Sequence, residues 1–130
     1  MTNPSGDSAP APGVQIKWAS AVAKHDYTAA EAYLSLKLAD DKVAKIIGRL
    51  RDAPLTTRRA NDILRAAGLT AAPLDDPGVI KDLIKVIERT RLSPVLVIRN
   101  DTGADIADGY HRVSLVYRID PYGDVPVKLA

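Results

Sequence analysis

Apolar residues recur at three- and four-residue steps through the first half of the chain, which predicts amphipathic helices. Three stripes show this spacing: Tyr27, Ala30, Leu34 and Leu38; Val43, Ile46, Ile47 and Leu50; Ala60, Ile63, Leu64 and Ala67. Residues that favour N-caps precede each stripe: Asp26 or Thr28, Asp40 or Asp41, and Thr56 or Thr57. Pro54 and Gly68 stand where the second and third helices should end.

The pattern changes after residue 75. Asp76 and Pro77 predict an N-cap with proline at the first helical position, followed by a stripe of Ile80, Leu83, Ile84 and Ile87. Residues 95–98 form a continuous apolar run, typical of a buried strand. A turn at 100–103, a short strand at 104–107, a helix from the 108–112 region to residue 118, and a strand at 125–129 then follow. Residues 14–18 alternate with period two, which predicts one more short strand.

These elements predict a single α/β (α+β) domain over residues 14–130, with a small mixed sheet and helices packed on it. Residues 1–13 contain prolines, glycines and serines and almost nothing to bury, so we expect a disordered tail there. The chain of 130 residues fits one domain with one core.

Composition excludes several classes of protein. Cysteine is absent, which rules out disulfides, thiolate metal sites and cysteine nucleophiles. No apolar run approaches the roughly 18 residues of a membrane span, and no secretion signal is visible, so we expect a cytoplasmic protein with no membrane partner. The net charge of +2 is too small to indicate a partner.

The strand-to-helix junction at Asp108-Gly-Tyr-His-Arg112 carries the most informative chemistry. Backbone N–H groups and the positive end of the dipole make a helix N-terminus an anion site, and Gly109 allows close approach of a ligand. Arg112 offers a planar fork for phosphate oxygens, and His111 can carry a proton near neutral pH. A structural turn with a solvated arginine is the alternative.

Residues 82–99 (DLIKVIERTRLSPVLVIR), the segment 106–112 (IADGYHR) and Val125-Pro-Val127 together resemble the ParB/sulfiredoxin superfamily. The resemblance covers roughly residues 77–129. It implies that the Asp108–Arg112 motif, called the box below, binds nucleotide phosphates, with Gly109, Tyr110, His111 and Arg112 forming the cofactor-binding loop. ATP, ADP or CTP with Mg²⁺ is the implied ligand, and no protein metal site is implied.

The sequence departs from the two best-known patterns of that superfamily. Sulfiredoxins need a cysteine where this chain has Tyr110, so sulfinic acid reduction by that route is excluded. ParB partition proteins have a metal-binding glutamate there and a following helix-turn-helix domain, so we do not expect a partition function. The box looks more like that of the free-standing members, which include serine kinases. Their catalytic carboxylate has no clear counterpart, since Glu31 is the only glutamate in the N-terminal half.

Two further groups of residues suggest chemistry. Asp108 could hold Mg²⁺ beside a phosphate or take a proton from a hydroxyl, or it could simply cap the following helix. His25 and Asp26 form a second polar cluster that could meet His111 or Asp108, with a helix cap beside an exposed histidine as the alternative.

Residues 42–65 are locally basic, with seven cations against two carboxylates. They are Lys42, Lys45, Arg49, Arg51, Arg58, Arg59 and Arg65, against Asp52 and Asp62. This stretch could bind a nucleic acid backbone, but a solvated helix face is the interpretation that we favour. Arg58 or Arg59 could also reach a phosphate in the main site.

We therefore expect a nucleotide- or phosphate-binding domain whose chemistry would be that of a phosphotransferase or nucleotide hydrolase. Asp108 and His111 are the candidate catalytic residues. A DNA-associated accessory protein that uses the 42–65 face, and a non-catalytic interaction module, are the alternatives. The residues do not decide whether the domain is an enzyme.

Overall fold

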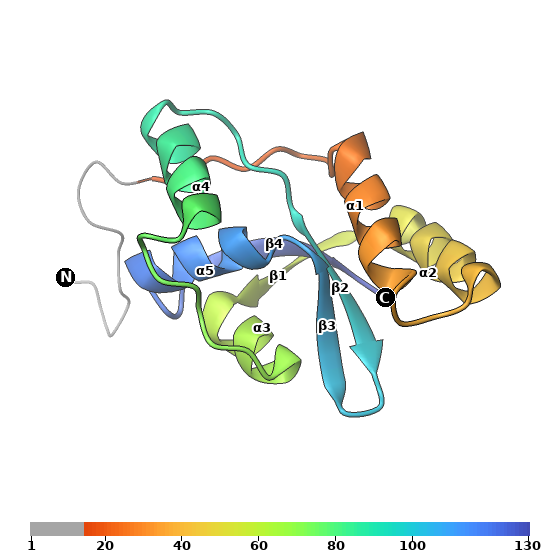
Figure 1. Ribbon diagram of the computed structural model, residues 1–130. Coiled ribbons are helices and arrows are strands. Elements are labelled where there is room, and N and C mark those ends of the chain that lie inside the picture. Colours follow the sequence, from red (N-terminus) through yellow and green to blue (C-terminus); the bar gives the residue numbers. More distant parts are fainter. Residues whose placement is uncertain (1–14) are drawn as a thin grey trace.

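A four-stranded mixed sheet organises the computed structural model, which describes residues 15–130 (Figure 1). The strands are β1 (Leu55–Arg59), β2 (Val95–Asn100), β3 (Gly103–Asp108) and β4 (Asp124–Leu129). Their spatial order is β1-β4-β2-β3, with β4 antiparallel to β1 and parallel to β2, and β3 antiparallel to β2. The predicted class, a small mixed sheet with packed helices, is confirmed. The predicted tail at 1–13 and Val14 lie outside the described residues.

Helices cover both faces of this sheet. They are α1 (Lys24–Leu34), α2 (Asp40–Asp52), α3 (Ala60–Ala67), α4 (Pro77–Ile87) and α5 (Tyr110–Ile119). In Figure 1, α1 and α2 lie together on one side of the sheet, while α3 and α5 lie on the other and α4 stands beyond α5. Within residues 15–130, no helix is both long and apolar enough to cross a membrane.

The alternation of side chains along β2 explains why both faces need covering. Leu96 and Ile98 join a core cluster with residues of α1 and α2, including Leu34 and Leu50. Val95 and Val97 point the other way, into a cluster with residues of α3, α5 and β4. A continuous apolar run is thus a strand buried on both faces, as the sequence predicts.

Several predicted boundaries are wrong. Residues 55–59 form β1 rather than the start of a helix, and α3 begins at Ala60 with Arg59 as its N-cap. The residues predicted to cap the first two helices are wrong as well, because Ala23 and Ala39 occupy the N-cap positions of α1 and α2. The predicted strand at 14–18 is reduced, in its described part, to one bridge between Trp18 and Leu92.

Other local predictions are confirmed. Asp76 caps α4 by accepting hydrogen bonds from the N–H groups of Gly78 and Val79. Gly68 ends α3 with a φ of 67°, the left-handed conformation that favours glycine at this position.

The apolar stripe predicted for α4 is only partly buried. Ile80, Ile84 and Ile87 are exposed, whereas Val79, Val86 and the half-buried Leu83 join the core.

Candidate functional site

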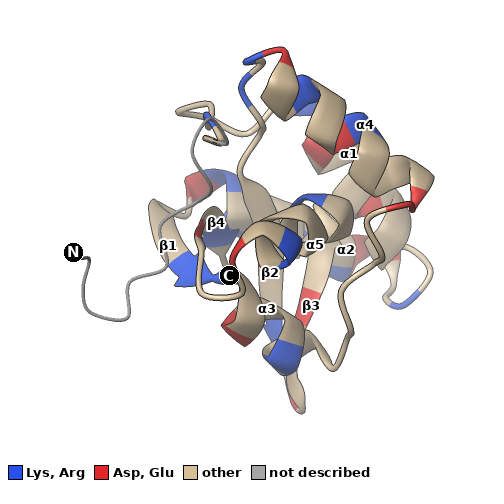
Figure 2. Ribbon diagram, turned by 90° about the vertical axis from the view of Figure 1, so that its left-hand side faces the viewer, with Lys and Arg blue, Asp and Glu red and all other residues tan. Residues whose placement is uncertain are grey.

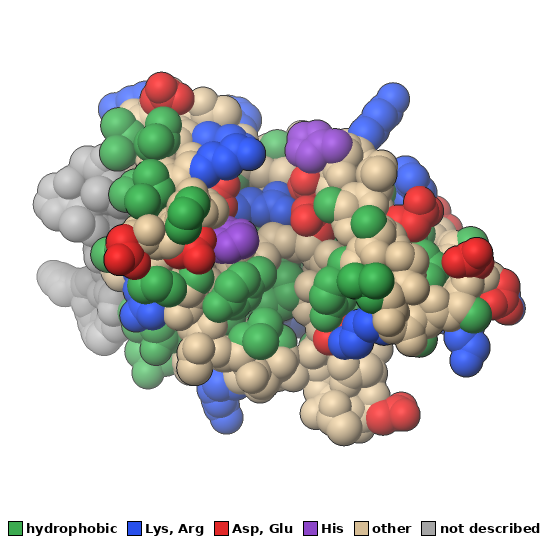
Figure 3. Space-filling model, in the orientation of Figure 1, with side chains coloured by type: hydrophobic (Ala, Val, Ile, Leu, Met, Phe, Trp, Pro, Cys, Tyr) green, Lys and Arg blue, Asp and Glu red, His purple; other side chains and the backbone are tan. Residues whose placement is uncertain are grey.

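A cleft of about 450 Å³ lies where the N-terminal part of α1, the side of α4 and the start of α5 meet the 91–93 segment. Figure 3 shows this hollow, with a purple histidine on each side and blue and red side chains at its floor. Its lining includes five residues that sequence analysis singled out: His25, Asp26, Asp108, His111 and Arg112. The cleft is therefore the candidate functional site.

Arg112 forms the floor of the cleft and is almost fully enclosed, with 11% of its side chain exposed. One terminal nitrogen donates to the Asp26 carboxylate at 2.9 Å and to the Ser93 carbonyl at 2.7 Å, and the other donates to Asp108 at 2.7 Å. The guanidinium thus joins α1, the 93–94 segment, the end of β3 and α5. A guanidinium with these partners holds the walls of the cleft in place, because its planar fork fixes the direction of each hydrogen bond.

Gly109 makes this arrangement sterically possible. Its φ of 113° is a backbone conformation that residues with a side chain rarely adopt. A Cβ at this position would also lie 2.8 Å from Val95 Cγ2 and 3.0 Å from a terminal nitrogen of Arg112. The glycine turns the chain sharply from β3 into α5, so that Asp108 and Arg112 bracket the turn and meet across it.

The two carboxylates that share Arg112 have opposite pKa shifts. Burial raises the pKa of Asp26, but the Ser93 hydroxyl and Arg112 outweigh it, so this pKa lies below its ordinary value of 3.8. Burial raises the pKa of Asp108 above 3.8; Arg112 opposes the rise, and the neighbouring negative charge of Asp26 adds to it. The hydrogen bond from Ser93 thus helps to keep Asp26 ionised, whereas at Asp108 burial outweighs the effect of Arg112.

Asp82 is the residue that sequence reasoning missed. It lies on α4 and lines the cleft, and only 9% of it is exposed. Within residues 15–130 its carboxylate forms no ion pair or side-chain hydrogen bond, although Arg112, Lys85 and His111 are near enough to act on its charge. Burial raises the pKa of Asp82 above 3.8. A buried carboxylate without a hydrogen-bond partner is costly, which is typical of a group kept for a ligand.

Its position could have been recognised from spacing. Asp82 comes three residues after Val79 and four before Val86, and both valines are buried. It therefore lies on the inward stripe of α4, where a carboxylate is unusual.

The two histidines lie on the walls of the cleft and do not form a pair with each other. His25 Nε2 lies 3.2 Å from Asp26, and His111 Nε2 lies 3.2 Å from Asp76, the cap of α4. The His111 ring packs directly on Gly78, where an added Cβ would lie 2.6 Å from the ring. The absence of a side chain at this position thus allows α4 and α5 to approach each other beside the site.

Three cations complete the lining: Lys81, Lys85 and Arg91. None of them forms an ion pair with any carboxylate in the described part of the chain. A terminal nitrogen of Arg91 donates a hydrogen bond to the Trp18 carbonyl at 3.1 Å, which holds the guanidinium beside the cleft. These side chains can bind an anion without first giving up an ion pair.

The box residues contribute unequally. His111, Arg112 and Asp108 line the cleft, whereas Gly109 and Tyr110 are not among its lining residues. The Tyr110 hydroxyl donates instead to the Thr70 carbonyl at 2.6 Å, on a different side of α5. Asp108 does not cap α5, since its carboxylate accepts from Arg112. Glu31 lies away from the cleft, in a separate groove between α1 and α2.

The seven basic residues of the 42–65 stretch do not gather on one surface. Four lie on α2, two on the strand β1 and one on α3, and α2 and α3 pack against opposite faces of the sheet. In Figure 2 the blue segments are spread over many elements. Arg59 pairs with Asp62, and neither Arg58 nor Arg59 lines the main cleft. The described residues also contain no group of three or more histidine or acidic side chains able to hold a metal ion.

Comparisons with protein-family models, with curated proteins and with solved structures found no match to this chain.

Proposed function

We propose that the cleft binds the phosphate group of a nucleotide or another phosphorylated small molecule, in a ParB/sulfiredoxin-like domain. The observation that carries the proposal is the set of three cations, Lys81, Lys85 and Arg91, around one cleft and free of carboxylate partners in residues 15–130. Cationic side chains beside a helix N-terminus are a recurring way to bind phosphate. The element order α4-β2-β3-α5-β4 agrees with the order on which the resemblance rests.

Arg112 acts in this proposal by positioning other groups. Its hydrogen bonds to Asp26, Asp108 and Ser93 use the guanidinium within the protein, so phosphate charge is neutralised mainly by the lysines and Arg91. His111, at the start of α5, adds a ring nitrogen that already lies 3.2 Å from Asp76. A phosphate bound in the cleft would give the His111 ring a second hydrogen-bond acceptor besides Asp76.

Asp82 extends the proposal from binding to reaction. As a buried carboxylate that lines the cleft and has a raised pKa, it can accept the proton of a ligand hydroxyl as that oxygen bonds to the terminal phosphorus of a nucleoside triphosphate. The bond from that phosphorus to its bridging oxygen breaks in the same step, and the nucleoside diphosphate leaves. Asp108, which the sequence suggested for this role, is engaged by Arg112 at 2.7 Å. Mg²⁺ that accompanies a nucleotide normally keeps several waters and is bound by the phosphates and one or two carboxylates. Asp82 is the carboxylate of the cleft that is not hydrogen-bonded to Arg112, so in a complex with Mg²⁺ it could instead supply that ligand.

Thermal melting tests the proposal, with inorganic phosphate, ATP, ADP and CTP as probes, each with and without Mg²⁺. A ligand at 100 times its dissociation constant adds about 2.7 kcal/mol, a shift of several degrees for a domain of this size. We expect at least one probe to raise the melting temperature of the wild type.

The Lys81→Ala/Lys85→Ala variant should lose most of that shift. Lys42→Ala/Lys45→Ala, on exposed positions of α2 outside the cleft, is the matched control and should keep it. A shift that survives in the cleft variant, or no shift with any probe, would overturn the proposal and favour a non-catalytic interaction module.

A further inference from the structure

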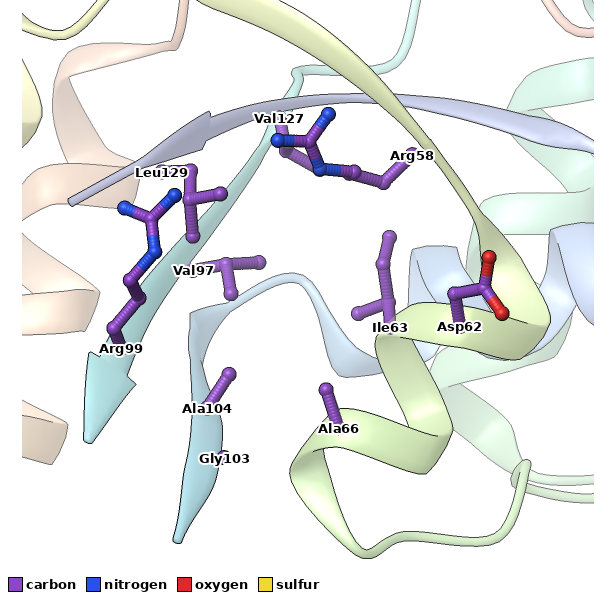
Figure 4. Close-up of a pocket in the computed structure, with 10 residues that line it drawn as sticks. All are labelled: Arg58, Asp62, Ile63, Ala66, Val97, Arg99, Gly103, Ala104, Val127 and Leu129. Atoms are coloured by element: carbon purple, nitrogen blue, oxygen red, sulfur yellow. The ribbon is translucent and has the colours of Figure 1, made fainter. Parts of the chain in front are cut away.

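A second pocket, separate from the cleft, opens on the face of the sheet that α3 covers. Its volume is about 330 Å³, and its wall is formed by residues of β1, α3, β2, β3 and β4 (Figure 4). None of its lining residues belongs to the charged cleft. Whatever this pocket binds is therefore independent of the proposed phosphate site.

The floor of the pocket is apolar because it continues the core. Val97, Val127 and Ile63 line it, and all three belong to the main core cluster. The helix α3 has only eight residues, about 12 Å of length, so it leaves part of the sheet uncovered. A surface of this kind is typical of small-molecule pockets, which are mostly apolar with a few polar groups.

Small residues determine the shape of the pocket. Ala66 and Ala104 face it from α3 and β3, and Figure 4 shows them across the pocket from Arg58 and Leu129. Gly103 has a φ of 154°, and a Cβ there would collide with the carbonyl oxygen of Ala66. The glycine thus lets the start of β3 approach α3 closely enough to close that side of the pocket.

Two arginines stand at its rim. Arg99 follows Val95 and Val97 on the same face of β2, so strand alternation directs it toward the pocket. Arg58 enters from β1 and makes only long hydrogen bonds, 3.4 and 3.5 Å, to its own strand. Neither forms an ion pair within residues 15–130. Asp62, which also lines the pocket, is engaged instead by Arg59 at 3.0 Å and by Arg65 at 3.6 Å.

We propose that this pocket binds a small apolar acid, a molecule with one carboxylate on an aliphatic or aromatic body. The apolar floor takes the body, and the guanidinium groups of Arg58 and Arg99 take the carboxylate. Apart from these two arginines, the charged side chain of the lining is Asp62, whose carboxylate is paired with Arg59 and Arg65. The two guanidinium groups at the rim therefore favour an anion over a neutral apolar molecule, because a neutral ligand would cover the arginines without giving them acceptors.

Octanoate is a suitable probe, with its amide, octanamide, as an uncharged ligand of the same shape. The measurement is a titration of ¹⁵N-labelled protein by NMR, which gives both the dissociation constant and the location of the ligand. We expect octanoate to bind with a dissociation constant below about 1 mM. The shifted signals should centre on residues 63–66 and 103–104, and octanamide should bind at least tenfold more weakly.

Variants locate the two halves of the pocket. Arg58→Ala/Arg99→Ala should weaken octanoate binding at least tenfold and bring it close to octanamide, whereas Arg49→Ala, an exposed arginine of α2, should change nothing. Ala66→Leu adds a side chain to the cavity at an exposed helix position and should block both ligands.

Three results of the ligand titrations would overturn the proposal. They are no binding at millimolar octanoate, equal binding of the acid and the amide, and signal shifts that centre on α4 and α5 instead. Concentration-dependent shifts of the same residues without ligand would also overturn it, because they would identify a second copy of the chain as the occupant.

Discussion

The Arg112 guanidinium lies 2.9 Å from the carboxylate of Asp26, a residue 86 positions earlier in the chain. This contact ties α1 to the start of α5 across the cleft. The 2.7 Å contact between Arg112 and Asp108 ties the end of β3 to the same guanidinium. A buried ion pair stabilises little relative to an apolar pair, but it fixes geometry and is costly to break. The structure of the cleft therefore depends on one side chain.

Replacement of Arg112 should destabilise the protein strongly. Arg112→Ala leaves two carboxylates beside each other without their cation, which typically costs about 3–5 kcal/mol in a buried setting. Denaturation in urea measures this loss. Arg49→Ala, on the exposed side of α2, should change the free energy of unfolding by less than about 0.5 kcal/mol. Equal effects of the two substitutions would show that the contacts of Arg112 do not support the fold.

Gly109 and Gly48 form a matched pair for testing the turn into α5. Gly109→Ala must adopt an unfavourable φ and push against Val95 and Arg112, so we expect a loss of about 2 kcal/mol or more. Gly48 lies inside α2, where an added Cβ has no neighbour within 4 Å. Gly48→Ala should therefore stabilise the protein by about 0.5–1 kcal/mol. Urea denaturation of both variants checks the two signs together.

Asp82 should make the protein less stable as the pH rises. Burial raises the pKa of Asp82 in the folded state above 3.8. As the pH rises, the unfolded chain therefore loses this proton first, and the free energy of unfolding falls above about pH 3.8. Asp82→Asn should accordingly be more stable than the wild type at pH 7, by about 1 kcal/mol. The difference should shrink to nothing below about pH 3, where Asp82 is protonated in both the folded and the unfolded state of the wild type.

Asp26 should show the opposite dependence. Its folded pKa lies below 3.8, so its stabilising contribution is present above that pH and is lost as the pH falls through the folded value. Unfolding measured from pH 2 to pH 7 for the wild type, Asp26→Asn and Asp82→Asn separates the two effects. The exposed Asp101→Asn variant is the control. Parallel curves for all four proteins would contradict the electrostatic account.

Local signals in the sequence predicted the C-terminal half well. Asp76-Pro77 marks the start of α4, the apolar run at 95–98 marks β2, and the glycine at 109 marks the turn into α5. Each of these depends on residues close to one another in the chain. The strand β1 escaped prediction because its sequence, LTTRR, is polar and mostly exposed, and its pairing with the distant β4 makes it a strand.

The site was predicted only in part for the same reason. His111, Arg112 and Asp108 were recognised because they surround a glycine turn, and they do line the cleft. The pairing of Arg112 with Asp26 depends on how α1 folds back over the sheet, which no local pattern records. Because this pairing engages the guanidinium within the protein, our proposal gives Arg112 the role of positioning the cleft, while its predicted role as a phosphate ligand stays a prediction.

The most direct test of the phosphate proposal is an NMR titration of ¹⁵N-labelled protein with inorganic phosphate and with ADP, each at constant ionic strength. We predict saturable shifts of the backbone signals of His111 and Arg112 and of residues 81–85 and 91–93, which surround the cleft. The Lys81→Ala/Lys85→Ala variant should show weaker binding at the same positions. Titrations that leave these signals unchanged, or that move mainly those of α2, would contradict the proposal that this cleft binds phosphate.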